Sequence, residues 1–292
     1  MPEMPAQPSA ARGAPAGDGN GMSFQPVIVG SGLAGWSMLK STMERQLTQF
    51  AARPDVRRDV AHFRSAIPEQ GSAEDLVQDR TALRVALGAF GLIDDLNNRY
   101  FIGRVLQEGT EDEHALANRL TDDRYRSMAT MFSSLNYSLT LTKTEAFADD
   151  VVARYQAVSF EAAVGEVDGN LRLALAFQRL LPEIAKDSGT NNAAWYHVMG
   201  QPPVRSVMEG ALSLPASVGK LDIDRQLELF KDKARQLFGT DDLTTIALEE
   251  NRETAIRRFL VRAQLAEAPS AVGMQAALSL VSQTAQFMRA NN

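Results

Sequence analysis

The stretch that decides the fold reads SAEDLVQDRTALRVALGAFGLIDDLNNRYFIGRVLQEGTEDEHALANRL, residues 72–120. Ser72 and Asp75 have the spacing of a capping box, in which the serine oxygen accepts a first-turn N–H and the carboxylate reaches back. Apolar residues then recur at the spacing of one helix face: Leu76, Leu83, Leu87 and Phe90. Gly91 is the residue type that ends helices in a left-handed conformation. The pattern predicts one helix that begins at Ser72 and ends before Gly91.

Two more amphipathic runs follow. The first is closed by Gly109 and has a wide apolar face, formed by Leu96, Phe101, Ile102, Val105 and Leu106. The second begins around Leu116 and Leu120 and leads into Tyr125, Met128 and Phe132. Short helices bury little surface alone, so we expect flanking helices to pack on them. Small residues at Ala82, Ala86 and Ala89 would let a neighbour approach closely.

Parts of this stretch resemble a known family. The run DRTALRVALGAFGL at residues 79–92 is similar to the signature of the DUF1217 family of alphaproteobacterial proteins. So are residues 97–99, 105–106 and 117–120, the opening FQP and GSGLAGW (24–26, 30–36), and LELFKD at 227–232. The resemblance covers most of residues 22–265. It implies a protein of unknown function without assigned catalytic residues, from a family often encoded beside flagellar genes.

Composition excludes several classes of partner. The 292-residue chain could form one large domain or two lobes, and its 45% apolar and 23% charged residues are typical of soluble globular proteins. A formal net charge of -6 argues against binding to nucleic acid or to anionic membrane surfaces. No run approaches the apolar length that a bilayer-spanning helix needs. We therefore predict no nucleic-acid partner and no membrane insertion.

The cysteine count limits which cellular compartments are compatible with the chain. Zero cysteines exclude disulfides, thiolate zinc sites and cysteine nucleophiles, but are compatible with the cytoplasm and with a disulfide-free export route. The first 21 residues lack the basic start and apolar core of a signal peptide. We expect a cytoplasmic protein, with export to the flagellum as the alternative.

The expected domain organisation has three parts. Residues 1–22 should be a disordered tail and 23–268 an α-helical domain with possible sub-lobes 23–132 and 145–268. Residues 269–292 should form a nearly uncharged C-terminal helix, which either docks on its own domain, the favoured interpretation, or engages a partner.

Most of the remaining chain is predicted to be helical. Helices are expected at Trp36 to Ala52, Pro54 to before Pro68, Lys143 to Ala157, Phe160 to Val167, Gly169 to Ala185, Asn191 to Met199, Val204 to Leu212, Asp222 to Phe238 and around Ile256 to Ala263. Residues 135–141 alternate apolar and polar side chains, which is typical of a strand. Its available partner is Val27 to Val29, so this segment is either half of a two-stranded pairing or an extended connector. The predicted class is an all-α orthogonal bundle of ten or more short helices, with at most a minor two-stranded element.

One motif suggests cofactor binding. Gly30 to Gly35 reads G-x-G-x-x-G between an apolar run and a helix, as in dinucleotide-binding folds. Two helices follow it where that fold needs a strand. Asp55 has the right spacing for a ribose ligand, but it follows Pro54 at a helix start, where the helix dipole explains it better. We favour a glycine-rich entry turn and keep a flavin- or nicotinamide-dependent enzyme as the alternative.

The other candidate residues have structural explanations. His62, His114 and His197 lack zinc-motif spacing. The acidic pairs are expected mainly to cap helices: Asp94–Asp95, Asp122–Asp123, Asp149–Asp150 and Asp241–Asp242. Trp195, Tyr196 and His197 could line a pocket, although a packed helix end is commoner. We therefore predict no catalytic, cofactor-binding or metal-binding residues. The expected function is non-enzymatic, with a protein partner in flagellar assembly engaged by the N-terminal tail, the Trp36 helix and residues 271–290.

Overall fold

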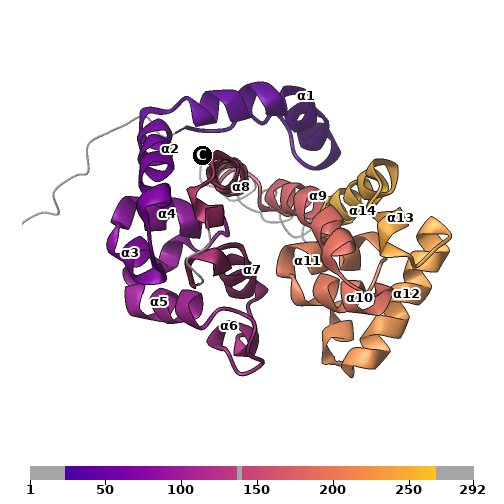
Figure 1. The fold of residues 1–292 in the computed structure, drawn as a ribbon. Helices are drawn as coiled ribbons and strands as arrows, with labels where there is room; N and C mark the ends of the chain where they lie inside the picture. The colour runs from indigo at the N-terminus through magenta and orange to yellow at the C-terminus, as the bar shows by residue number, and fades with distance from the viewer. Residues whose placement is uncertain (1–23, 137–139, 268–292) are drawn as a thin grey trace, which may run out of the picture.

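The structure, a computed structural model, describes residues 24–136 and 140–267. Across these two ranges it contains fourteen α-helices, five 3-10 helices and no strand, so the predicted all-α class is confirmed (Figure 1). The α-helices are α1 (Gly32–Ala51), α2 (Pro54–Ala66), α3 (Ala73–Gln78), α4 (Arg80–Gly88), α5 (Arg99–Glu108), α6 (Leu116–Arg119), α7 (Asp123–Met131), α8 (Glu145–Gly165), α9 (Gly169–Asp187), α10 (Asn191–Gly200), α11 (Pro202–Ala211), α12 (Ile223–Phe238), α13 (Leu243–Ile246) and α14 (Glu249–Glu267).

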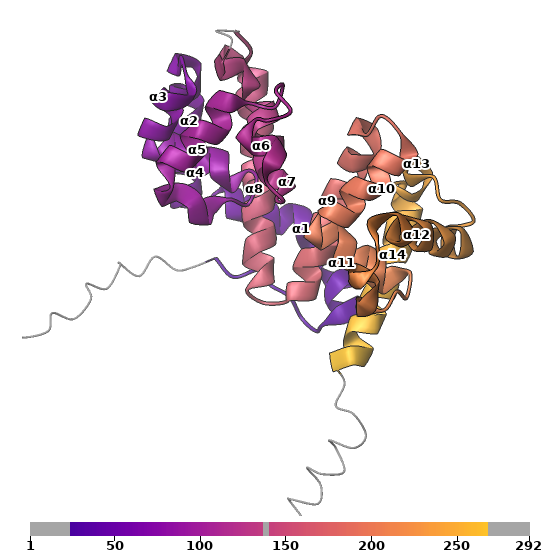
Figure 2. The same ribbon diagram turned by 90° about the horizontal axis from the view of Figure 1, so that it is seen from below.

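The helices are arranged in two lobes. The first lobe consists of α2–α8 and the second of α9–α14, and Figure 2 shows the two side by side when viewed from below. The long helices α8 and α9 form an antiparallel hairpin where the lobes join. Helix α1 runs across both lobes and contacts α8, α9 and α14 (Figure 1). Buried apolar side chains from both lobes form one continuous cluster. The proposed division at residues 132 and 145 stays a prediction, and the tail and the 269–292 helix lie outside the described residues.

The stretch 72–120 follows most of the sequence signals. The Asp75 N–H donates to Ser72 Oγ at 3.2 Å and the Gly71 N–H donates to the Asp75 carboxylate, so α3 begins at the predicted cap. Gly91 has the expected positive φ of 69°. The Leu92 N–H donates back to the Leu87 carbonyl at 2.9 Å, which closes the end of α4 in a left-handed cap.

The single helix predicted after Ser72 is wrong, because the chain breaks at Asp79. Its backbone is extended, and its Oδ1 accepts the N–H groups of Thr81 and Ala82, both at 3.0 Å. An aspartate that bonds the next free N–H groups offers the backbone an alternative to continuing the helix. The break turns α4 relative to α3, and α4 can then pack on α2 and α8.

The segment predicted as either a strand or an extended connector is neither in the residues that flank its centre. Residues 133–136 and 140–143 form 3-10 helices, whereas 137–139 lie outside the described residues. Asn136 Nδ2 donates to the Leu106 carbonyl at 2.7 Å, near the end of α5, and Leu135 is buried. In residues 133–136 the alternation therefore reflects one buried turn and a contact with the end of α5.

The possible partner strand, Val27 to Val29, bonds a side chain at Val27 instead of a strand. The Val27 N–H donates to Gln46 Oε1 at 2.8 Å, and Gln46 Nε2 donates to the Val27 carbonyl at 3.0 Å. One amide of α1 thus satisfies both polar groups of an extended residue, as a neighbouring strand would.

Helix α8 is continuous, whereas two helices divided near Val158 were predicted. Thr144 caps its first turn by accepting the Phe147 N–H at 3.2 Å. Packing between the first lobe and α9 overrides the weak local preference of the β-branched residue at the predicted break. Gly88 of α4 faces α8, where a Cβ on it would lie 2.7 Å from the Tyr155 ring.

Candidate inter-lobe binding cleft

A cleft with a volume of about 530 Å³ lies between the two lobes. Its floor is the α8–α9 hairpin. One wall is formed by the end of α4 and the start of α7, and the other by the junction of α10 and α11. The lining residues are Ala89, Phe90, Gly91, Thr121, Asp122, Arg124, Ser127, Arg154, Val158, Glu161, Arg172, Ala176, Arg179, Leu180, Gly200, Gln201, Pro202 and Pro203.

The floor carries ion pairs between the two hairpin helices. Arg179 of α9 donates through Nε and Nη2 to the two carboxylate oxygens of Glu161 on α8, at 2.7 and 2.9 Å. Seven residues earlier along α8, Arg154 donates to Glu183 of α9 at 2.9 Å. Bidentate arginine–carboxylate pairs have a fixed geometry and are stronger than neutral hydrogen bonds. These pairs hold α8 and α9 in register along the cleft.

Arg154 and Arg172 are among the cleft arginines that keep unused donors. Arg154 stacks over the Phe90 ring with 4.9 Å between the guanidinium carbon and the ring centre, and its buried Nε has no hydrogen-bond partner among the described residues. Arg172 is exposed and pairs with no carboxylate in residues 24–136 and 140–267. Arginine presents five N–H donors, so Arg172 can bind a further acceptor, and Arg154 can do so through Nη1 although its Nε is out of reach.

Arg124 binds the wall of the first lobe. Its guanidinium donates to the Asp122 carboxylate at 2.7 to 3.1 Å and to the Gly91 carbonyl at 2.5 Å. Burial raises the pKa of Asp122, but the hydrogen bonds from Arg124 outweigh it and hold that pKa below its ordinary value. Four arginines and two carboxylates line this part of the cleft, a local excess of two positive charges in a chain of net charge -6.

A second hollow of about 530 Å³ continues the cleft toward the end of α9. The two hollows share lining residues from both lobes, namely Phe90, Ser127, Arg154, Leu180 and Gln201. Beside it the lobes touch, since Arg126 Nη2 of α7 lies 3.4 Å from His197 Nε2 of α10. A guanidinium only donates, so Nε2 accepts and His197 Nδ1 donates to Ser188 Oγ at 3.0 Å.

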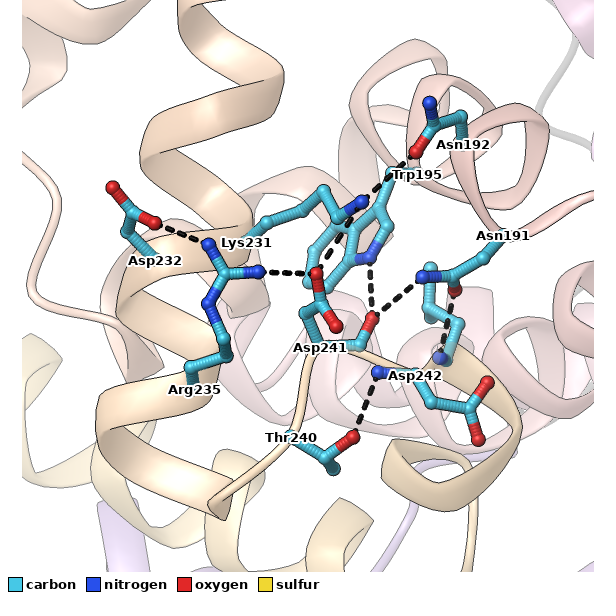
Figure 3. A network of polar contacts seen from close by, with 10 residues as sticks. Asn191, Asn192, Trp195, Lys231, Asp232, Arg235, Thr240, Asp241 and Asp242 are labelled. Atoms are coloured by element: carbon cyan, nitrogen blue, oxygen red, sulfur yellow. Dashed lines mark hydrogen bonds and ion pairs between the residues drawn. The ribbon is translucent and has the colours of Figure 1, made fainter.

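The predicted group Trp195, Tyr196 and His197 does not form one pocket. Trp195 is fully buried, and its Nε1 donates to the Asp241 carbonyl at 2.8 Å (Figure 3). Tyr196 is partly exposed and donates to Asp224 at 2.5 Å. Only His197 reaches the cleft.

The network around Trp195 ties the loop before α13 to α10. Asn191 Nδ2 donates to the same Asp241 carbonyl at 3.0 Å, and Arg235 of α12 donates to the Asp241 carboxylate at 2.5 Å (Figure 3). Lys231 lies 3.3 Å from that carboxylate. The network satisfies buried polar groups within the second lobe, so its role is structural.

The glycine motif at Gly30 to Gly35 is filled by protein atoms. A Cβ on Gly32 would lie 2.0 to 2.4 Å from the side-chain amide of Gln264 on α14, and one on Gly35 would lie 3.2 Å from Leu171 of α9. Gln264 also donates to the Ser31 carbonyl at 3.3 Å. The glycines thus admit the start of α1 into close contact with the second lobe, and the described chain has no strand on either side of them. Asp55 pairs with Arg53 at 2.7 Å at the start of α2.

The other candidate residues are dispersed. His62 lies 2.7 Å from Asp79, and His114 is exposed beside Glu113. In the part of the chain that the structure describes, no group of three His, Cys, Asp or Glu residues could hold a metal ion. Caps explain part of the acidic pairs, because Asp122 caps α7 and Asp242 caps α13.

The arginine-lined cleft was missed in the sequence. Arg154 and Arg179 fall on helices that the sequence predicts, and the spacing of seven between Arg172 and Arg179 places both on one face of α9. This spacing does not show that α8 packs against α9, and the cleft arginines find their carboxylate partners only through that packing.

The fold and the cleft define an all-α, two-lobed protein with a ligand-sized cleft that is positively charged at one end. No helix of the described ranges is both long and apolar enough to cross a membrane. The chain belongs to the DUF1217 family of proteins of unknown function, whose model matches residues 89–246. Every residue that lines the first hollow lies within that match, whereas α1 and α14 lie outside it.

A solved structure shares this fold. The crystal structure of protein AGR_C_984 from Agrobacterium tumefaciens is similar to this chain with 26% sequence identity and a TM-score of 0.65. The similarity covers 84% of this chain and 99% of that chain. A comparison with curated proteins gave no match.

Proposed function

We propose that this protein is a non-enzymatic binding protein that holds a segment of a protein partner in the cleft between its lobes. The observation that carries the proposal is the cleft itself, two adjoining hollows of about 530 Å³ each with shared lining residues. Pockets of this size accommodate small ligands or short stretches of chain. Two hollows in a row suit an extended segment better than one compact ligand.

The chemistry of the lining supports binding rather than catalysis. Its charged side chains largely engage one another, as in the pairs of Arg179 with Glu161 and Arg154 with Glu183. Such pairs fix the shape of a surface. Phe90 and Leu180 add apolar contact area next to them.

The partner that we propose is a flagellar component, because family members are often encoded beside flagellar genes. The protein would meet it in the cytoplasm, or at the flagellum if the chain is exported. The sequence suggested contact through the Trp36 face of α1. Trp36 is 2% exposed and its Nε1 donates to Glu253 of α14 at 3.1 Å, so this face already packs within the protein. The N-terminal tail and residues 271–290 lie outside the described residues.

The test is a pull-down from motile cells with a variant altered in the cleft. Leu180→Glu places a charge where the two hollows meet, and Leu265→Glu makes the same change at an exposed leucine of α14, outside the cleft. We expect flagellar proteins to be captured by the wild type and by Leu265→Glu, and to be lost with Leu180→Glu. Circular dichroism would establish that both variants fold.

A third arm uses a chain that ends at Ala268. Loss of capture with this chain, and retention with Leu180→Glu, would move the binding site from the cleft to the C-terminal residues. Capture that is unchanged in every variant would refute the proposal.

A further inference from the structure

We infer that the cleft recognises an acidic segment, whose carboxylates bind the arginines of the α8–α9 floor and whose apolar side chain packs against Phe90 and Leu180. The inference rests on the proposed function and names the chemical class of the partner segment. It is carried by the placement of Arg172, Arg179 and Arg154 along one side of the cleft.

The charge distribution gives the first argument. The whole chain has a net charge of -6, yet the lining of the first hollow has four arginines against two carboxylates. The adjoining hollow is lined by Asp123, Glu183 and Asp187 against Arg126 and Arg154, so the positive excess is confined to the first hollow. An excess of one sign of charge in a hollow raises the local concentration of the opposite charge. An acidic segment is thus repelled by the protein as a whole and attracted at this place, which favours selective binding.

Unused hydrogen-bond donors give the second argument. Arg172 has no carboxylate partner among the described residues and is exposed at the end of the floor. Arg179 uses Nε and Nη2 on Glu161, which leaves its Nη1 without a bond among the described residues. Arg154 uses Nη2 on Glu183, which likewise leaves its Nη1 without a bond in the described chain, whereas its Nε is buried. A guanidinium can bind a second carboxylate through such remaining donors.

Spacing gives the third argument. Arg172 and Arg179 are seven residues apart on α9, and a helix rises 1.5 Å per residue, so their Cα atoms lie about 10 Å apart. A segment in the extended polyproline II conformation has three residues per turn and rises about 3.1 Å per residue, so residues i and i+3 lie on one face about 9 Å apart. Carboxylates at every third position of an extended segment would therefore match the two arginines.

The wall opposite the arginines limits what else can bind. Pro202 and Pro203 have no N–H groups, so this wall cannot form a backbone ladder with a passing strand. Recognition then depends on the side chains of the bound segment. Its carboxylates bind at the floor, and an apolar group packs against the Phe90 ring, whose other face is stacked against Arg154.

The test measures fluorescence anisotropy with the full-length protein and a labelled peptide of about ten residues. The peptide carries glutamate at every third position, with leucine and serine between. A matched peptide replaces each glutamate by glutamine. We expect the glutamate peptide to bind at least about tenfold more tightly, and the difference to shrink as salt is added, because charged pairs near a surface are screened.

Two protein variants with the same change in charge locate the site. Arg172→Glu reverses the unpaired arginine in the cleft, and Arg225→Glu reverses an exposed arginine of α12 outside it. We expect Arg172→Glu to weaken binding of the glutamate peptide at least about tenfold and Arg225→Glu by less than about twofold. Equal effects of the two variants, or equal binding of the two peptides, would overturn the inference.

The pull-down separates this inference from the function on which it rests. If Leu180→Glu abolishes capture of the partner and Arg172→Glu does not, the cleft binds a partner through other chemistry and the acidic class is wrong. If neither variant affects capture, the cleft is not the binding site and both proposals fail. Because Arg172 is exposed, its replacement should leave the protein folded, and thermal unfolding would check this.

Discussion

Replacing Arg179 by methionine should lower the free energy of unfolding by about 3 kcal/mol. Methionine keeps most of the apolar stem, but the carboxylate of Glu161 loses both hydrogen bonds and its counter-charge. The side chain of Glu161 is 10% exposed, so water replaces the guanidinium only in part. Breaking a buried ion pair costs about 3–5 kcal/mol, and the lower end applies here because Arg179 is 21% exposed.

Chemical denaturation followed by circular dichroism measures this loss, and a double variant isolates its cause. Arg179→Met with Glu161→Leu removes both charges, and should recover most of the stability because no uncompensated carboxylate remains. The matched control is Arg225→Met, whose partner Glu228 is 64% exposed; this change should cost less than about 1 kcal/mol. An equal loss in Arg179→Met and Arg225→Met, or no recovery in the double variant, would refute the reasoning.

Three other predictions concern backbone and pH. Gly210→Ala should lower the free energy of unfolding, measured by urea denaturation, by about 1–2 kcal/mol, because its Cβ would lie 2.7 Å from the Phe259 ring. Gly169→Ala, with open space around it, should be neutral or stabilising. Ser213→Gly should raise the stability by about 0.5–1 kcal/mol and increase Tm, since Ser213 holds a φ of 60° that glycine adopts without strain; a lower Tm would contradict this. Hydrogen bonds from Thr244 and Thr245 hold the pKa of Asp242 below its ordinary value of 3.8. The stability that the ionised carboxylate contributes is therefore fully present above pH 3.8 and is lost as the pH falls through the folded pKa. Asp242→Asn should therefore lose less stability than the wild type below about pH 4. The free energy of unfolding measured against pH would contradict this if both proteins lost the same amount in that range.

The fold was predictable where a residue acts on its own turn. Ser72 caps α3, and Gly91, Gly109 and Gly239 all have the positive φ that ends a helix or its turn. These are local effects, so one stretch of sequence contains the whole cause. The class of the fold followed from them, because amphipathic spacing recurred along most of the chain.

Predictions failed where two local options compete or where distant residues decide. Asp79 could have continued a helix, but its carboxylate bonds the next N–H groups and begins a new one. The extended segment at Val27 depends on Gln46, whose amide takes the place of a strand. No hydrophobic periodicity in the sequence indicates the contact between Gln46 and Val27.

The cleft was the least predictable feature. Each arginine could be placed on a helix face, yet the partner of Arg179 comes from α8 and that of Arg154 from α9. The wall at Gly200 to Pro203 comes from a third element. A site built from the joining of two lobes becomes visible only after the hairpin has folded.

The contact of Trp36 with Glu253 joins residues 217 positions apart, and Lys40 binds the same carboxylate at 2.9 Å. During synthesis α1 leaves the ribosome before its acceptor on α14 has been made. We therefore expect α2–α8 to condense, with part of α1 packed on α8, while the Trp36 end of α1 is still without its α14 contacts. Docking of this end on α14 is then a late step of folding, and a nascent chain stalled before residue 253 should leave the Trp36 end of α1 open to proteolysis.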